Sequence, residues 1–489
     1  MHRHHVERKM MMNCFGLIKK MVILFFLSGV ICLSFVTPAR AELTIEDEKK
    51  LGQEFYDKMA KNDFLIQEKR MNDYITKVGT TVLNSVKNPL FDYRFSIVKD
   101  SSVNAFATPG GYVYVNRGLI ALVDTEGELA AVLAHEIAHV NARHIADMVN
   151  KATKVNIATL LAVIAGAFLG GGGDLSAALM GFSLAASQTM ALKYSRDNEE
   201  EADRYGMTYL VKAGYKADSS LNVLKMMRRY EFYSSTVPSY FMTHPGTDDR
   251  IRYIDGLLET TYAKSGGKDE IVGPFGRIKA VLMTGGSDVE SKIRYFESEV
   301  RKNPQNVDML YGLGVVQARK GLYGESLVTF KQALLLAPAD KEVLRDIGVD
   351  YFKLGQYPES IDYLMKAYKI DQTDIKTLAY LGNSNEAMGF YEKAIEYFHA
   401  LEASELDDEE IYYSIGMVYG KLKEMGDSHY YFGIYFKKQK KTETALFHFK
   451  EALKYYPMNN PRYQDIDREI RQLSGEADAK KRSDGKKRN

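Results

Sequence analysis

Two histidines and a glutamate lie at a spacing that suits a metal site. His135, Glu136 and His139 form the pattern His-Glu-x-x-His. If this stretch is helical, His135 and His139 lie on one face, so both imidazoles can reach a common point. Neutral imidazole is a good ligand for zinc, and Glu136 could act there as the general base of a metalloprotease. The pattern alone is moderately specific, because such spacings also arise by chance in helix-rich chains.

An acidic segment further along the chain could complete this site. A catalytic zinc ion takes three protein ligands and keeps one position open. Glu199 and Asp203 share a face of a predicted helix. Glu199 could supply the third ligand, and Asp203 could accept a hydrogen bond from the outer nitrogen of a zinc histidine and fix its tautomer. The alternative is a solvated acidic face, but Ala202, Tyr205 and Tyr209 indicate that this helix has a packed side.

Neighbouring residues predict the elements that must position the site. Thr125 and Glu128 form a capping box ahead of the histidine motif, so we expect the motif to lie on a helix. Further upstream, two glycines allow a close turn, and the residues after them alternate as in an edge strand. An unpaired edge beside the metal could hold a substrate peptide by main-chain hydrogen bonds. We expect this substrate edge at Gly111, Tyr112, Val113 and Tyr114.

From about residue 288 onward the chain repeats itself with a period of 34 residues. The repeat is carried by evenly spaced glycines: Gly314, Gly348, Gly382 and Gly416. A second apolar position keeps the same step: Phe330, Leu364, Phe398 and Phe432. This period, with small residues where paired helices cross, is the tetratricopeptide pattern. Such units stack into an α-solenoid whose concave groove can dock a partner or client protein.

The first residues of the chain have the pattern of an export signal. Lys19 and Lys20 precede the apolar run 21–36, and a small-x-small cleavage site ends at Ala41. The run is shorter than the ~20 residues that a spanning helix needs. An uncleaved N-terminal anchor is the alternative. We expect residues 1–41 to be removed and the mature chain to be periplasmic.

Composition narrows the class of protein further. Hydrophobic residues make up 45% and charged residues 26% of the chain, which is typical of a folded globular protein. Lys and Arg number 65 against 64 Asp and Glu, so binding to nucleic acid by phosphate neutralisation is disfavoured. Both cysteines, Cys14 and Cys32, lie in the export signal. The metal ligands of the mature chain are therefore expected to be His and Glu alone, as suits an oxidising compartment.

A further apolar segment, residues 155–192, lies between the two parts of the predicted site. Its two apolar runs are split by glycines at 170–173, and neither reaches ~20 uninterrupted apolar residues. We expect a buried or membrane-touching helical hairpin, which could act as a lid or as a peripheral membrane contact. A pair of spanning helices is the alternative.

These motifs together resemble a known family. His-Glu-x-x-His followed by Glu-x-x-x-Asp is similar to the zinc metallopeptidases that include the prenyl-protein (CAAX) endopeptidases and the HtpX membrane proteases. The stretch 104–115 is similar to the family's edge strand, and Thr243-His244-Pro245 with Arg250 to its late His/Arg motif. With the export signal and the repeats, the chain resembles periplasmic members of the BepA type. The resemblance implies a mainly α fold, in which a helical zincin-type domain with a small β-sheet binds one Zn²⁺ per chain.

His244 and Arg250 have two alternative roles in this site. Both could stabilise the oxyanion of the tetrahedral intermediate. His244 could instead approach the zinc as a fourth ligand and silence it, because it lies on a loop next to a proline.

The other histidines are not assigned to the metal. His144 follows His139 by five residues, about 140° around a continuous helix, and is interpreted as structural or surface. His399, His429 and His448 lie in the repeats and are interpreted as packing or surface residues. The predicted catalytic set is therefore Glu136, Asp203, His244 and Arg250, with His135, His139 and Glu199 as metal ligands.

The chain is thus predicted to be an exported zinc endopeptidase that cleaves unfolded or misassembled envelope proteins. The repeats would dock clients or the outer-membrane assembly machinery. One alternative is a chaperone or assembly scaffold that acts mainly through the repeat groove, and another is an integral membrane metalloprotease. The expected segments are a signal peptide (1–41), a metallopeptidase domain (42–262), a linker (263–287), the repeat domain (288–475) and a disordered basic tail (476–489).

Overall fold

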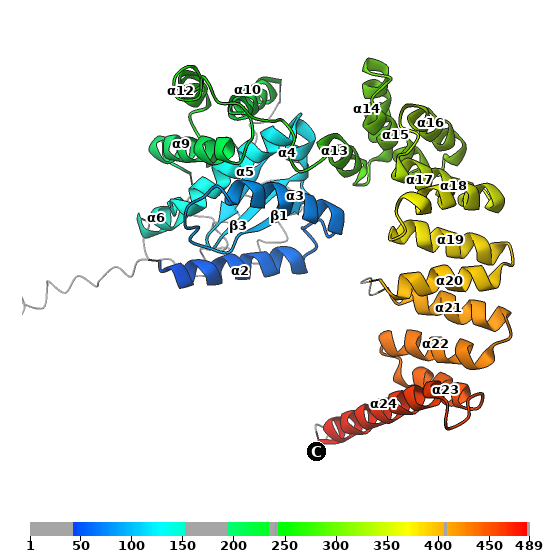
Figure 1. Cartoon of the computed structure of the whole chain (residues 1–489). Coiled ribbons are helices and arrows are strands. Elements are labelled where there is room, and N and C mark those ends of the chain that lie inside the picture. The colour runs from blue at the N-terminus through cyan, green and yellow to red at the C-terminus, as the bar shows by residue number, and fades with distance from the viewer. Residues whose placement is uncertain (1–42, 152–192, 234–239, 241–242, 405–407, 487–489) are drawn as a thin grey trace, which may run out of the picture. The chain divides into compact units, whose positions relative to one another are not determined.

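The computed structural model describes residues 43–151, 193–233, 240, 243–404 and 408–486 (Figure 1). The chain divides into two compact units, Met1–Val272 and Gly273–Asn489. Each unit is described by itself. The predicted export signal and the apolar segment 155–192 lie outside the described residues. Within the described part of the chain, no helix is both long and apolar enough to cross a membrane.

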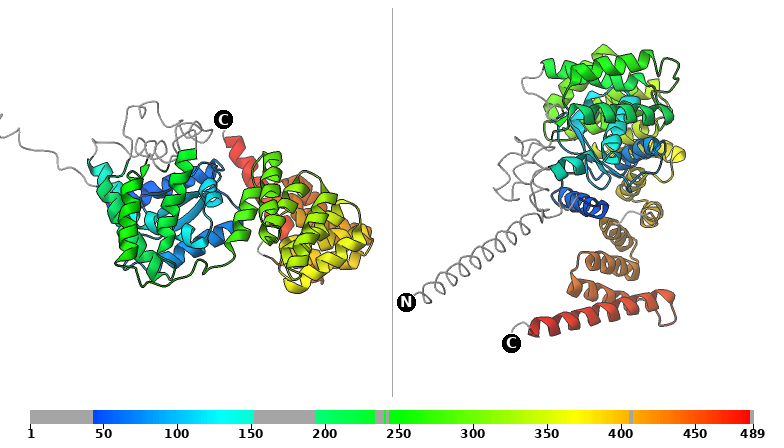
Figure 2. Two further views of the ribbon diagram at one scale, coloured as in Figure 1. Left: turned by 90° about the horizontal axis from the view of Figure 1, so that it is seen from above. Right: turned by 90° about the vertical axis from the view of Figure 1, so that its left-hand side faces the viewer.

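The first unit combines helices with one small sheet (Figures 1 and 2). Its helices are α2 (Ile45–Lys61), α3 (Lys69–Leu83), α4 (Arg117–Leu122), α5 (Glu126–Asn141), α6 (His144–Lys151), α9 (Arg196–Lys212), α10 (Asp218–Tyr233) and α12 (Thr247–Glu259). Its strands are β1 (Arg94–Val98), β2 (Ala105–Thr108) and β3 (Tyr112–Asn116).

Helix α5 is the centre of this unit. Every residue from Glu126 to Val140 is buried, as expected for a helix that is mostly apolar on all sides. The Thr125 side chain caps the helix by accepting a hydrogen bond from the Glu128 amide at 3.2 Å. The Glu128 carboxylate accepts a hydrogen bond from the amide of Asp124. In the predicted capping box the donor would be the amide of Thr125, one residue later.

The sheet has the order β1-β3-β2. β3 pairs with β1 in parallel and with β2 antiparallel. The prediction of a free substrate edge at Gly111, Tyr112, Val113 and Tyr114 is therefore wrong, because the main chain of β3 is bonded on both sides. Gly110 and Gly111, with φ of 86° and 96°, turn the chain back so that β3 lies between its neighbours. The outer strand that contacts α5 is β2.

The second unit is a stack of helices, as the repeat period predicts. It consists of α13 (Phe275–Thr284), α14 (Val289–Lys302), α15 (Val307–Arg319), α16 (Tyr323–Leu336), α17 (Lys341–Lys353), α18 (Tyr357–Ile370), α19 (Ile375–Ala387), α20 (Tyr391–Glu402), α21 (Glu410–Lys421), α22 (Met425–Lys438), α23 (Thr442–Leu453) and α24 (Pro461–Lys486).

The repeated glycines have a packing role. A Cβ atom on Gly314 would lie 2.4 Å from the ring of Phe330, and one on Gly382 would lie 2.4 Å from the ring of Phe398. Each glycine thus makes room for the large apolar side chain of the next helix. This contact explains why both positions recur with the same period.

Two segments outside the counted repeats are helical. The stretch 263–287, predicted as a linker, contains α13, whose Arg277 pairs with Asp308, Asp340 and Glu342 of the repeats. These pairs attach α13 to the second unit. At the other end, α24 continues through residues 476–486, for which the sequence predicts a disordered tail.

Candidate metal centre

Two packed helices and one loop bring the predicted site residues together. Helix α5 carries the His-Glu-x-x-His motif, and α9 carries Glu199 and Asp203. The two backbones pass close to each other at Gly206, where a Cβ atom would lie 3.2 Å from the Cα of His135. His244 lies in the loop before α12, and Arg250 lies in the first turns of that helix.

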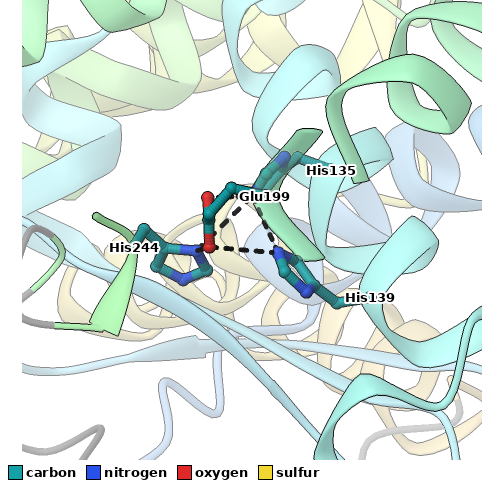
Figure 3. Close-up of side chains that lie close together, drawn as sticks. All are labelled: His135, His139, Glu199 and His244. Carbon is teal, nitrogen blue, oxygen red and sulfur yellow. Dashed lines mark hydrogen bonds and ion pairs between the residues drawn. The ribbon is translucent and has the colours of Figure 1, made fainter. Parts of the chain in front are cut away.

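The ligand atoms of four buried residues converge on one point. One atom each from His135, His139, Glu199 and His244 lie within 4.8 Å of one another. Figure 3 shows these side chains pointing toward a common centre. The Nε2 atoms of His135 and His139 are 3.0 Å apart, and Nδ1 of His244 lies 3.0 Å from Oε1 of Glu199. Within the part of the chain that the structure describes, no other such cluster is found.

The chemistry of these donors fits zinc. Imidazole nitrogens with one carboxylate oxygen are a usual zinc ligand set, whereas calcium and magnesium prefer oxygen ligands. Burial lowers the pKa of His139 well below its ordinary value, which favours the neutral form that binds metal. Burial would raise the pKa of Glu199, but Arg250 and His244 hold it well below the usual range, so it stays an anion.

Glu136 lies beside this cluster with no structural task of its own. It is fully buried, and neither carboxylate oxygen has a hydrogen-bond partner among the described residues. Its nearest ionic neighbour is His244, whose Nε2 lies 3.6 Å from Oε1. Burial raises the pKa of Glu136. A buried carboxylate without hydrogen-bond partners is costly, so its presence here points to a chemical role.

Asp203 and Arg250 hold the ligands in place. Oδ1 of Asp203 lies 3.0 Å from Nδ1 of His135, as predicted for a residue that fixes the tautomer of a zinc histidine. Arg250 donates to Asp203 through Nε at 2.8 Å and Nη2 at 2.7 Å, and its Nη1 lies 2.7 Å from Oε2 of Glu199. The guanidinium is thus directed at these two carboxylates.

Three aromatic or imidazole side chains at the site were missed by sequence reasoning. The ring of Tyr194 stacks on His139 with centroids 3.8 Å apart, and the ring of Tyr240 stacks on His244 at 4.4 Å. His144 is buried and contacts His139, so its interpretation as a possible surface residue is wrong. Only its position directly after the histidine motif could have indicated this contact.

The residues of the predicted substrate edge lie in the sheet instead of the metal cluster. Tyr112 donates a hydrogen bond to Gln53 of α2 at 2.6 Å, and the rings of Tyr114 and Phe106 stack at 4.9 Å. The Tyr114–Phe106 contact lies in the core of the unit, whereas Tyr112 reaches the exposed Gln53.

Comparisons with known proteins give the family. The model of peptidase family M48 matches residues 69–258, and a tetratricopeptide repeat model matches residues 347–374. The chain is 33% identical over 216 residues to the putative beta-barrel assembly-enhancing protease of Vibrio cholerae, covering 44% of this chain and 45% of that one. It is 30% identical over 220 residues to the beta-barrel assembly-enhancing protease of Escherichia coli, covering 44% of each chain. The match therefore spans less than half the length of these relatives.

More distant similarities extend beyond bacteria. The chain is 28% identical over 226 residues to the mitochondrial metalloendopeptidase OMA1 of Schizosaccharomyces pombe, covering 46% of this chain and 64% of that one. Among solved structures, it is similar to MamA, with a TM-score of 0.30 and 24% identity over 32% of this chain and 91% of that chain. All the metal-cluster residues lie within 69–258. The domain that carries them therefore belongs to peptidase family M48 and is followed in this chain by tetratricopeptide repeats.

Proposed function

We propose that this chain is a zinc-dependent endopeptidase. The observation that carries the proposal is the convergence of His135, His139 and Glu199 on one point, with the buried carboxylate of Glu136 beside it. These residues come from two helices separated by more than fifty positions in the sequence, so a chance solvated acidic face does not explain them.

The side chains of the site have three different roles: metal binding, general base catalysis and positioning of the ligands. His135, His139 and Glu199 would hold the zinc, which when bound supplies Lewis acidity for a peptide carbonyl and for water. Glu136 acts as the general base that takes a proton from the attacking water and passes it to the leaving amine. Arg250 and Asp203 keep the ligands oriented. This positioning role replaces the predicted oxyanion role of Arg250, because its guanidinium is already directed at Glu199 and Asp203.

The outer strand β2 is the candidate for binding the substrate main chain. It is paired with β3 on one side and packs on α5, which carries the histidine motif. All four of its residues are buried, so a peptide could add to this edge only after the edge is uncovered. A peptide that added to this edge would be held by main-chain hydrogen bonds with little sequence preference. This suits a protease of unfolded or misassembled proteins.

The predicted export signal supports a place in the periplasm. The names of the bacterial relatives support a role in protein quality control at the outer membrane. The stacked repeats would dock clients or the assembly machinery and raise the local concentration of substrate. The segment 155–192 would then serve as a lid or a peripheral membrane contact.

Cleavage of an unfolded protein tests this function. The purified chain should cleave reduced casein, lose the activity in 1,10-phenanthroline and regain it when zinc is added back. Cleavage that persists in the chelator would contradict the proposal.

His244 is proposed to close the zinc site as a fourth ligand. Its Nδ1 lies 3.4 Å from Nε2 of His135 and 3.0 Å from Oε1 of Glu199, so it faces the metal position and not open space. Pro245 and Gly246 line a cavity of about 210 Å³, which gives the loop room to move away. Cleavage would then be slow until the loop shifts.

His244→Ala is therefore expected to raise casein cleavage by about tenfold or more, since the closed state would no longer compete with substrate. His399→Ala, a histidine of the second unit, should leave the rate unchanged. Initial rates at equal zinc content provide the comparison. A fall in the His244→Ala rate would instead favour the oxyanion role.

A further inference from the structure

His144 occupies a buried position behind the metal ligand His139. It is the first residue of α6, and only 3% of its surface is exposed. Its Nδ1 lies 2.9 Å from Nδ1 of His139. Its other ring nitrogen, Nε2, lies 3.2 Å from Oε2 of Glu201 on α9. The three side chains form a continuous row from the metal cluster to the surface, where about half of the Glu201 side chain is exposed.

The directions of these hydrogen bonds follow from the role of His139. Its Nε2 faces the other ligands, 3.0 Å from Nε2 of His135 and 3.6 Å from Oε1 of Glu199. A neutral imidazole that offers Nε2 to a metal carries its proton on Nδ1. His139 therefore donates to Nδ1 of His144. The proton of His144 then lies on Nε2 and is donated to the Glu201 carboxylate.

The chain reaches this arrangement by a break in the helix. Helix α5 ends at Asn141, and Arg143 has a φ of 56°, in the left-handed region. The Arg143 side chain is anchored by Glu48 Oε1 at 2.7 Å and by the Leu43 carbonyl at 2.6 Å. This turn brings His144 back toward His139, which a continuous helix would not do.

The two zinc histidines thus have outer partners from the same helix. His135 contacts Asp203 directly, and His139 reaches Glu201 through His144. Both carboxylates belong to α9, which also supplies Glu199. Such outer contacts fix the tautomer and ring orientation of a ligand.

We propose that His144, held by Glu201, is a positioning residue that orients His139 and fixes its tautomer for metal binding. This inference rests on the proposed zinc site. It predicts a specific requirement for a hydrogen-bond acceptor at the place of Nδ1 of His144.

Two substitutions of His144 separate this role from simple packing. The amide of Asn reaches the place of Nδ1, whereas the amide of Gln reaches the place of Nε2. The measurement is zinc affinity of the purified chain by competition with a chromogenic chelator, together with the visible absorption spectrum after cobalt substitution. Thermal unfolding of each variant gives the effect on stability.

His144→Gln is expected to weaken zinc binding by about 10–100-fold and to alter the cobalt spectrum. His144→Asn keeps a hydrogen-bonding group at the place of Nδ1 but loses the contact with Glu201, so it should weaken zinc binding about as much as Glu201→Ala and less than His144→Gln. Glu201→Ala should weaken binding in the same direction as His144→Gln. Its matched control is Glu200→Ala, on the same helix and similarly exposed, which should have no effect.

Zinc affinity and cobalt spectra that are equal in the unchanged protein and in both His144 variants would overturn the inference alone. The inference would also be overturned if zinc binding were weakened equally in both variants and in proportion to their loss of thermal stability. His144 would then have only a packing role. An unchanged chain that binds no zinc would overturn the proposed function as well.

Discussion

Glu136→Gln is expected to lower casein cleavage by about 10²–10⁴-fold while the protein still binds zinc, because the amide cannot accept and return the proton. The side chain is fully buried and its oxygens have no hydrogen-bond partner among the described residues, so the near-isosteric amide removes little structure. Initial rates and metal content of the same preparations provide the test.

A matched control separates this effect from a general response to losing a carboxylate. Glu259→Gln changes an exposed residue at the end of α12 and should leave the rate unchanged. If Glu136→Gln cleaves casein at the rate of the unchanged protein, Glu136 is not the general base. If Glu136→Gln abolishes cleavage but the variant still supports protein quality control at the outer membrane, the scaffold alternative gains support.

The second large effect is expected at Arg250. Arg250 is 6% exposed, and its guanidinium lies between the carboxylates of Glu199 and Asp203. Arg250→Met would leave both buried anions without their cation, which typically costs about 3–5 kcal/mol. The variant should therefore unfold at lower urea concentration and lose zinc.

Two further variants sharpen this prediction. Arg250→Lys keeps the charge but cannot pair with both carboxylates through a planar guanidinium. Its stability in urea and its zinc content should therefore lie between those of the unchanged protein and Arg250→Met. Arg196→Met removes an exposed pair with Asp249 and should change stability by less than about 1 kcal/mol. An Arg250→Met protein that is as stable as Arg196→Met and still holds zinc would show that the pairing is not required.

The metal cluster could be predicted because its residues form two pairs, each with a short spacing within one helix. His135 and His139 on one helix, and Glu199 and Asp203 on another, each follow the four-residue spacing of a helix face. The structure places both pairs at the interface of α5 and α9. The packing of these two helices could not be read from spacing, but the shared chemistry of the two pairs indicated it.

The sheet edge could not be predicted because strand order is not local. Alternation along residues 112–115 suggests an edge strand, yet β3 lies between β1 and β2, and all five of its residues are buried. A strand in the middle of a small sheet that is covered on both faces has no solvent side to mark it. The two glycines predict the turn at Gly110 and Gly111, but they do not indicate which strand will lie at the edge of the sheet.

The contact of His144 with His139 could not be predicted from helix geometry, because the helix ends before His144. A turn of 140° would point it away from His139, but the left-handed Arg143 interrupts the helix first. A non-glycine residue in the left-handed region of φ and ψ is uncommon, and its residue type gives little sign of it in the sequence. In the repeats, by contrast, each glycine recurs together with the side chain that packs on it. The 34-residue period could therefore be recognised from the sequence.

The most direct test of the central claim is the metal content of the purified chain, measured by inductively coupled plasma mass spectrometry. The proposed site predicts one zinc ion per chain in the unchanged protein and none in the His135→Ala, His139→Ala double variant. The account would be contradicted by an unchanged chain without zinc, or by a double variant that still carries one zinc ion per chain.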